Sequence, residues 1–133
     1  MSLIQLTYAS HPFGFDDPML SGILLDARRC NARDGVTGAL IVRQDIYLQL
    51  LEGPAKLVEA TYQRIRRDDR HTDIRAVRRS DIKERLFPEW AMRDDPARSW
   101  MWSREMVAQG KAEAASAEDV LAIFKRLRLT LPV

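Results

Sequence analysis

The chain has 133 residues, the length of one compact domain, and a second full domain would not fit. Hydrophobic residues make up 46% and charged residues 30%, and no apolar run approaches the roughly 20 residues needed to cross a bilayer. The formal charge of +2, from 21 basic and 19 acidic residues, is too balanced to indicate a nucleic-acid partner.

Two features indicate the compartment. The first residues lack a basic segment followed by an apolar one, so we expect no signal peptide. The single cysteine, Cys30, cannot form an intrachain disulfide, which is typical of a reducing cytoplasm. We therefore expect a cytoplasmic protein.

The first third of the chain carries a strand, a helix and a hairpin. Residues 2–10 alternate in polarity with period two and predict a strand. The apolar spacing predicts a helix over residues 19–32, and Gly35 can take the left-handed conformation that ends it. Two short apolar runs, 36–42 and 46–51, are separated by three polar residues and predict a hairpin.

The middle of the chain completes a sheet. A second helix is expected to open at Gly53-Pro54, because proline is well placed in a first helical turn, and to run to about residue 68. Further strands are expected at 74–79 and 90–93. This order of elements, β-α-β-β-α-β-β, predicts an α+β, ferredoxin-like sheet with two helices on one face.

The chain beyond Pro96 changes in composition and predicts C-terminal helices. Residues 116–119 resemble a capping box, and the helix after them presents one apolar stripe. This stripe is formed by Val120, Phe124 and Leu127. We expect residues 1–97 to form the main domain and residues 98–133 a helical extension that packs on the sheet or on a partner. The stripe and an exposed sheet indicate a homodimer or a higher homo-oligomer.

Several polar residues interrupt the apolar faces of these elements. Gln49 lies in mid-strand between two leucines, where glutamine is disfavoured and must be hydrogen-bonded if it is buried. The others are Tyr8 and Ser10 in the first strand, Asn31 in the first helix, and Arg64 and Asp68 four residues apart in the second.

Each of these residues has an ordinary explanation. Asn31 could cap its helix, Gln49 could face water from an edge strand, and Arg64 with Asp68 could be a surface ion pair that contributes little. Together, however, the residues would point into one slot on the same sheet face. Amides, a phenol and a hydroxyl between apolar walls suit a flat heterocycle with hydrogen-bonding edges.

Other kinds of site lack their motifs. His11 and His71 are far apart and unsupported by nearby acids or cysteines, so we expect no metal site. The chain has no Ser-His-Asp pattern, glycine-rich phosphate loop or nucleophile elbow, and we expect no enzymatic activity. Cys30 is expected to be a small core residue rather than a reactive thiol.

Five stretches match the motifs of one known family in order and spacing. They are Leu3-Ile-Gln-Leu-Thr-Tyr8-Ala-Ser10, Ala27-Arg-Arg-Cys-Asn31 with Gly35-Val-Thr-Gly38, Tyr47-Leu-Gln49-Leu-Leu-Glu52-Gly53-Pro54, Arg64-Ile-Arg-Arg-Asp68-Asp-Arg70-His71, and Arg85-Leu-Phe87-Pro-Glu-Trp90-Ala-Met92. By these stretches the chain resembles the BLUF family, the sensors of blue light using FAD. Each motif alone is weak, but five in register are specific, and they cover roughly residues 1–93.

The resemblance implies a blue-light photoreceptor that binds FAD, or alternatively FMN or riboflavin. It implies that Tyr8 is the photochemical electron donor, that Gln49 bridges it to the N5/O4 edge of the flavin, and that Asn31 holds the O4/N3 edge. The remaining implied residues are Ser10, Arg64 and Asp68 as cofactor contacts, and Trp90 and Met92 on a strand that switches. The family often has a polar residue directly before the asparagine, where this chain has Cys30.

The resemblance also implies an output through contacts with a downstream signalling protein that the sequence does not identify. Two other functions compete with the photoreceptor. One is a light-blind interaction module that kept the fold, which protein unable to take up FAD would favour. The other is a small flavin reductase, which an absence of NAD(P)H turnover would dismiss.

Overall fold

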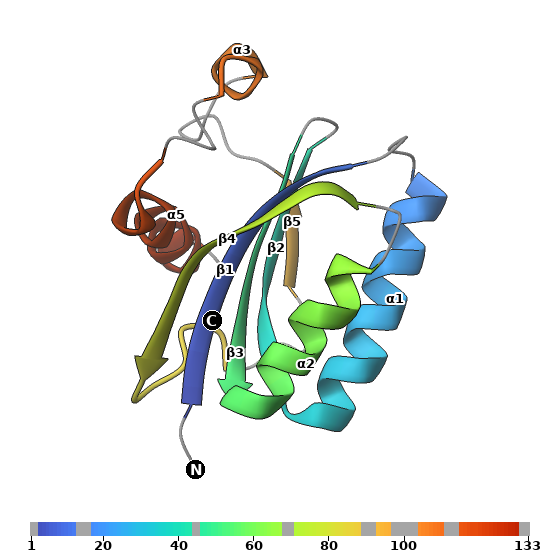
Figure 1. Ribbon diagram of the computed structural model, residues 1–133, viewed down its shortest axis with the longest axis vertical. Coiled ribbons are helices and arrows are strands. Elements are labelled where there is room, and N and C mark those ends of the chain that lie inside the picture. The colour runs from blue at the N-terminus through green and yellow to red at the C-terminus, as the bar shows by residue number, and fades with distance from the viewer. Residues whose placement is uncertain are drawn as a thin grey trace.

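The computed structural model describes residues 3–12, 17–43, 46–67, 71–88, 93–96, 104–110 and 115–130. Its described part is built on one five-stranded sheet with the order β4-β1-β3-β2-β5 (Figure 1). All neighbouring strands are antiparallel except β5, which runs parallel to β2. The α+β, ferredoxin-like prediction is confirmed. The strands are β1 (Leu3–Pro12), β2 (Thr37–Arg43), β3 (Ile46–Pro54), β4 (His71–Ile82) and β5 (Arg93–Pro96).

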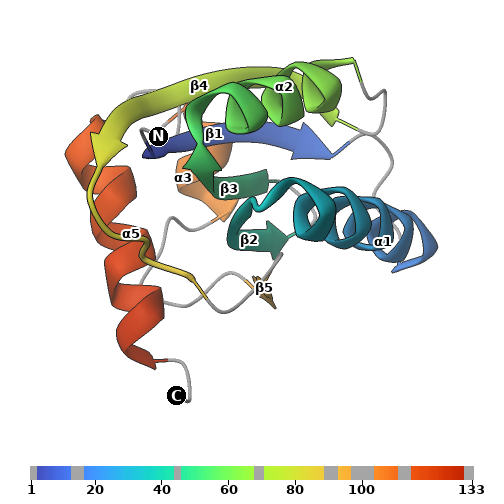
Figure 2. The same cartoon turned by 90° about the horizontal axis from the view of Figure 1, so that it is seen from below.

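Helices cover both faces of this sheet. Helices α1 (Asp17–Asp34) and α2 (Ala55–Arg66) lie side by side on one face, as predicted. Helix α5 (Ala117–Thr130) lies on the opposite face (Figure 2). A short helix, α3 (Arg104–Ala108), precedes it, in the segment where C-terminal helices were predicted without bounds for this one. The central strands β1 and β3 are therefore covered on both sides.

Two glycines fix where α1 ends. Gly35 has a φ of 70°, and the N–H of Val36 donates to the carbonyl oxygen of Asn31 at 2.9 Å. A hydrogen bond between residues five positions apart, around a left-handed residue, is the mark of a Schellman motif. Gly53 in β3 has a φ of 155°, and a Cβ atom there would lie 2.9 Å from the carbonyl oxygen of Gly35. The residue directly after α1 therefore lies against the backbone of β3 at a place where only glycine fits.

Side chains alternate between two hydrophobic clusters. The helix-pair cluster, under α1 and α2, contains the buried residues Ile4, Leu6, Tyr8, Val36, Leu40, Tyr47, Leu51 and Val58. The α5 cluster contains Ala39, Ile41, Leu48, Leu50, Phe87, Val120, Phe124 and Leu127. Because successive strand residues point to opposite faces, β1 and β3 each contribute to both sides of the sheet.

Helix α5 begins with the predicted capping box. The N–H of Asp119 donates to the Ser116 hydroxyl at 3.1 Å, and the N–H of Ser116 donates to the Asp119 carboxylate at 3.4 Å. The predicted stripe of Val120, Phe124 and Leu127 is fully buried against the sheet of the same chain. The argument for a homodimer from this stripe and an exposed sheet is therefore wrong, since each covers the other.

Some boundaries differ from the predictions. Strand β4 spans twelve residues, several more than the predicted 74–79. The last strand spans Arg93–Pro96, so it shares only Arg93 with the predicted strand 90–93. Residues 90–92 lie outside the described part. Within the described residues, no helix combines the length and the apolar composition that a membrane crossing requires.

Candidate functional site

Tyr8 and Gln49 are direct cross-strand partners. The register of β1 and β3 places Tyr8 opposite Gln49 and Ser10 opposite Tyr47. Tyr8 is 0% exposed and Gln49 is 4% exposed, so the water-facing explanation of the glutamine is wrong. Paired side chains on one sheet face have Cβ atoms roughly 4.5–5.5 Å apart, so these two side chains are neighbours under the helix pair.

The other strand beside Gln49 is apolar at this point. Leu40 of β2 is the second cross-strand partner of Gln49 and is 1% exposed. Gln49 is thus flanked in register by a phenol and by an alkyl side chain, neither of which carries charge at neutral pH. Its amide meets no formal charge from either neighbouring register position.

A second phenol, which the sequence reasoning missed, contacts the first. The ring of Tyr62 in α2 lies 5.6 Å from the ring of Tyr8, centroid to centroid, at an interplanar angle of 53°. Burial raises the pKa of the Tyr62 phenol, against smaller lowering effects of Arg66 and of a backbone hydrogen bond at Ala76. Tyr62 follows the inward-facing Val58 by four residues, so helical spacing could have identified it.

Asn31 adds an amide from α1. It is 1% exposed, and it follows Ala27, which packs on the helix-pair cluster, by one helical turn. The bond from Val36 engages its backbone carbonyl. Gly35 takes the left-handed conformation that ends the helix, so the explanation of Asn31 as the capping residue is wrong.

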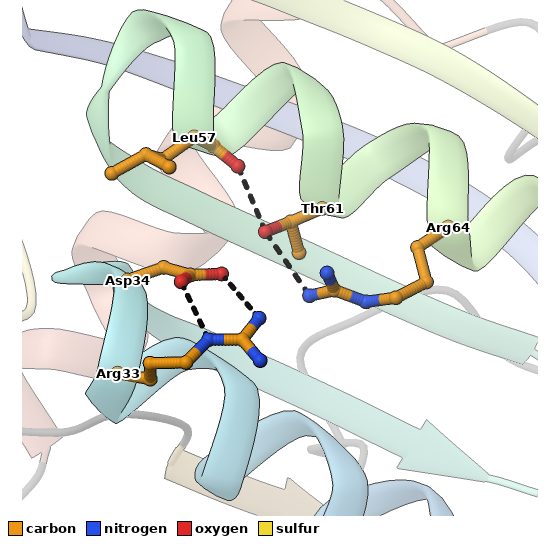
Figure 3. Close-up of polar contacts among 5 residues, drawn as sticks. All are labelled: Arg33, Asp34, Leu57, Thr61 and Arg64. Carbon is orange, nitrogen blue, oxygen red and sulfur yellow. Dashed lines mark hydrogen bonds and ion pairs between the residues drawn. The ribbon is translucent and has the colours of Figure 1, made fainter.

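Charged side chains gather where α1 ends beside α2 (Figure 3). Arg33 donates two hydrogen bonds to Asp34, at 2.8 and 3.0 Å. The Arg33 hydrogen bond is the largest of the effects that hold the pKa of the Asp34 carboxyl below its usual range, and Arg64 adds a smaller one. The exposed Arg64 reaches back along α2 to the Thr61 hydroxyl at 3.4 Å, and Thr61 donates to the Leu57 carbonyl at 2.9 Å.

Three predicted site residues cannot be placed. Asp68, Trp90 and Met92 lie outside the described residues, so the Arg64–Asp68 pair and the position of the switching strand stay predictions. Cys30 is half-buried rather than a core residue, since it lies on the side of α1 next to the inward-facing Asn31. In the described part of the chain, no three His, Cys, Asp or Glu residues are placed to hold a metal ion.

The buried polar groups have the chemistry that a flavin ring needs. An isoalloxazine presents carbonyl acceptors, a ring nitrogen and an N–H along its polar edges. Asn31 and Gln49 each offer an amide with two donors and an acceptor, and Tyr8 and Ser10 each offer a hydroxyl. Leu40 and Ile4 supply apolar surface on the same sheet face. The residues that the structure brings together therefore fit this group.

Comparisons with known proteins agree with this fit. The sequence profile of the BLUF family, described as sensors of blue-light using FAD, matches residues 3–93. The photoactivated adenylate cyclase subunit beta of Euglena gracilis is 40% identical over 95 residues. That match covers 68% of this chain but only 11% of the relative, so the chain spans about a tenth of the curated relatives it matches.

Solved structures share the fold over nearly the whole chain. The dark-state structure of BlrB, a BLUF protein, is 28% identical, has a TM-score of 0.76 and covers 98% of both chains. A bacterial light-regulated adenylyl cyclase is also 28% identical, with a TM-score of 0.71 over 90% of this chain and 36% of its own.

Proposed function

This chain belongs to the BLUF family, whose members bind FAD to sense blue light, and from that premise we propose that Tyr8 and Gln49 are its photochemical pair. The observation that carries the proposal is their register, because two buried residues that face each other across β1 and β3 can exchange a proton over a short distance. The family resemblance assigns the same two positions.

The proposed contacts to the cofactor come from the sheet and from the helix pair. Gln49 and Asn31 would hold the polar edge of the ring with their amides, and Ser10 would support its hydrogen bonding. Arg64, with Asp68, would contact the ring and the ribityl-phosphate side. FAD is the cofactor of the family, and FMN or riboflavin could occupy the same ring contacts. When bound, the flavin supplies absorption of blue light and, once excited, a strong oxidant.

Tyr8 would then give up an electron and its phenolic proton, and Gln49 would receive or pass that proton. The Gln49 amide can rotate, or can shift to an imidic form, so that donor and acceptor exchange places. A carboxylate or an alkyl group could not make this exchange. Neither cross-strand partner of Gln49 is a charged group that would favour one orientation of the amide, and return of the electron and proton would restore the starting state.

The output would leave through protein contacts. Trp90 and Met92 would lie on the strand that responds to Gln49, and residues 98–133 would form the extension that reports the change. We propose a sensor rather than a catalyst, because the family that matches residues 3–93 is described as sensors of blue light. Its partner would be a downstream signalling protein or domain, in the cytoplasm. A homodimer stays a proposal, on a surface other than the α5 stripe.

The test is an absorption spectrum of the purified protein with FAD, recorded before and after blue light. We expect a yellow protein whose blue band shifts slightly to longer wavelength and recovers in the dark. Colourless protein that cannot be reconstituted with FAD would instead indicate the light-blind module. Turnover of NAD(P)H would indicate the flavin reductase.

A further inference from the structure

A buried carboxylate lies on the sheet face opposite Tyr8 and Gln49, and the proposed photochemistry does not use it. Glu52 of β3 is 0% exposed. It accepts a hydrogen bond from the side-chain amide of Gln5 at 3.1 Å and another from the backbone N–H of Phe87. A carboxyl group removed from water is costly unless its oxygens are hydrogen-bonded, and these two donors meet that need for Glu52.

The amide of Gln5 has its direction fixed by charge on both sides. Arg78 of β4 donates to the Gln5 side-chain oxygen at 2.7 Å, which leaves the amide NH₂ group to face Glu52. Rotation of this amide would set an NH₂ group against a guanidinium and an oxygen against a carboxylate. The network therefore has one arrangement of donors and acceptors, running from β4 through β1 to β3.

The same carboxylate anchors the segment that follows β4. Phe87 is fully buried, and its ring meets the ring of Phe124 in α5 edge to face, with 6.3 Å between centroids. Arg85, in the same segment, donates to the hydroxyl of Thr37 at 3.0 Å, and Thr37 is the cross-strand partner of Glu52. Residues 83–88 are thus fixed to β2, β3 and α5 just before the residues that lead into β5.

We propose that Glu52 is a positioning residue that couples the strand carrying Gln49 to α5, by holding Phe87 against Phe124. This coupling rests on the proposed function, because the change that it would transmit is the light-driven rearrangement of Gln49. A displacement of β3 at Gln49 reaches Glu52 three residues along the same strand, and the bond to Phe87 passes it to the packed rings. Such a coupling requires that the hydrogen bonds around Glu52 have a single arrangement of donors and acceptors. If Phe87 were held loosely, β3 could move without moving Phe87.

The donor pattern provides a matched pair of variants. In Glu52→Gln the new NH₂ group must face either the NH₂ group of Gln5 or the backbone N–H of Phe87. Turning Gln5 over would instead face its NH₂ group toward Arg78, so one bond is lost in every arrangement and Phe87 is no longer held in a single way. Adding Gln5→Glu restores every bond: Arg78 donates to the new carboxylate at position 5, the amide at position 52 donates to it, and Phe87 donates to that amide. Glu59→Gln, on an exposed carboxylate paired with Arg79, is the control.

The measurement is hydrogen exchange of the full chain with FAD, in the dark and under blue light, with the absorption shift recorded on the same samples. We expect light to change exchange in α5. In Glu52→Gln we expect exchange in residues 83–88 and in α5 to be about tenfold faster in the dark, as for a lost hydrogen bond to a charged group. The light-dependent difference in α5 should vanish while the absorption shift stays, and the double variant should restore that difference.

The coupling is overturned if Glu52→Gln keeps the light-dependent difference in α5, or if the parent protein shows the absorption shift and no change in α5. A lost absorption shift in Glu52→Gln alone would also overturn it, because Glu52 would then act on the photochemistry. Should Glu52→Gln not fold, Phe124→Leu removes the ring contact and should lose the same difference. If the parent lacks the absorption shift, the proposed function fails, and dark exchange still tests the anchoring.

Discussion

The two central strands carry two glutamines on opposite faces of the sheet, and their surroundings differ in one respect. Gln5 lies opposite Glu52 and also meets Arg78, so charge of opposite sign fixes each end of its amide. Gln49 lies opposite Tyr8 and Leu40, which are both neutral. The presence of a glutamine is therefore not enough to give an amide that changes orientation, since Gln5 is held in one. We expect a glutamine to exchange donor and acceptor only where no neighbouring charge fixes the orientation of its amide.

Replacing Gln49 should change the protein's response to light more than any other substitution considered. Gln49→Leu removes the only group of this pair that can exchange donor and acceptor, so we expect complete loss of the light-induced absorption shift with flavin still bound. Difference spectra under blue light measure it. The matched control is Gln5→Leu, which should keep the shift, and a shift persisting in Gln49→Leu would refute the mechanism.

The second prediction compares stability on the two faces. Gln5→Leu leaves Glu52 with one donor fewer and removes the acceptor of Arg78, and we expect it to lower the free energy of unfolding by about 2–3 kcal/mol. Gln49→Leu in the flavin-free protein should cost about 1 kcal/mol or less, because neither cross-strand partner of Gln49 is a charged group. Urea unfolding of both variants measures this difference, and equal losses would mean that the two faces do not differ as described.

The third prediction concerns how the helix pair is held over Gln49. Gly53→Ala places a methyl group 2.9 Å from the carbonyl oxygen of Gly35, at a φ of 155°, and we expect a loss of about 1–3 kcal/mol together with weaker FAD binding. Gly35→Ala is the control, since its φ of 70° is also left-handed but no atom lies within 4 Å of the new methyl group. FAD affinity as weak in Gly35→Ala as in Gly53→Ala would show that the close contact is not what matters.

The smallest effect lies on the α5 side. Ser116→Ala removes the side-chain cap of α5 and should cost about 1 kcal/mol of unfolding free energy. The absorption shift should be unchanged, because the cap lies on the other side of the sheet from Tyr8 and Gln49. Ser116→Thr keeps the hydroxyl and should behave like the parent. An altered shift in Ser116→Ala would mean that the start of α5 acts on the photochemistry itself.

Local patterns in the sequence predict much of this molecule. Period-two alternation places Tyr8 and Gln49 on a buried face, and Gly35 and the capping box at Ser116 mark helix ends as the structure has them. These features depend on residues a few positions apart. The resemblance to the BLUF family adds that Gln49 bridges Tyr8 to the flavin. The register of β1 and β3 places the two residues opposite each other, and the bridging role stays a prediction.

Long-range contacts were beyond local patterns. Gln5 and Glu52 are 47 residues apart, and their hydrogen bond depends on the register of two strands that no sequence period specifies. The α5 stripe was equally ambiguous, because an amphipathic helix has the same pattern whether it covers its own sheet or a second copy. The approach of Tyr62 to Tyr8 likewise depends on how α2 crosses the sheet.

The contact between Gly35 and Gly53 has a consequence for how often the proposed light sensor would rearrange without light. Asn31 lies four residues before Gly35, and Gln49 lies four residues before Gly53, so each amide is carried on a segment that ends at this contact. A displacement of the end of α1 toward the sheet would press on β3 at this point, so we expect the distance between the two amides to vary less than it would without the contact. In a light sensor, such a constraint would lower the rate of rearrangement in the dark.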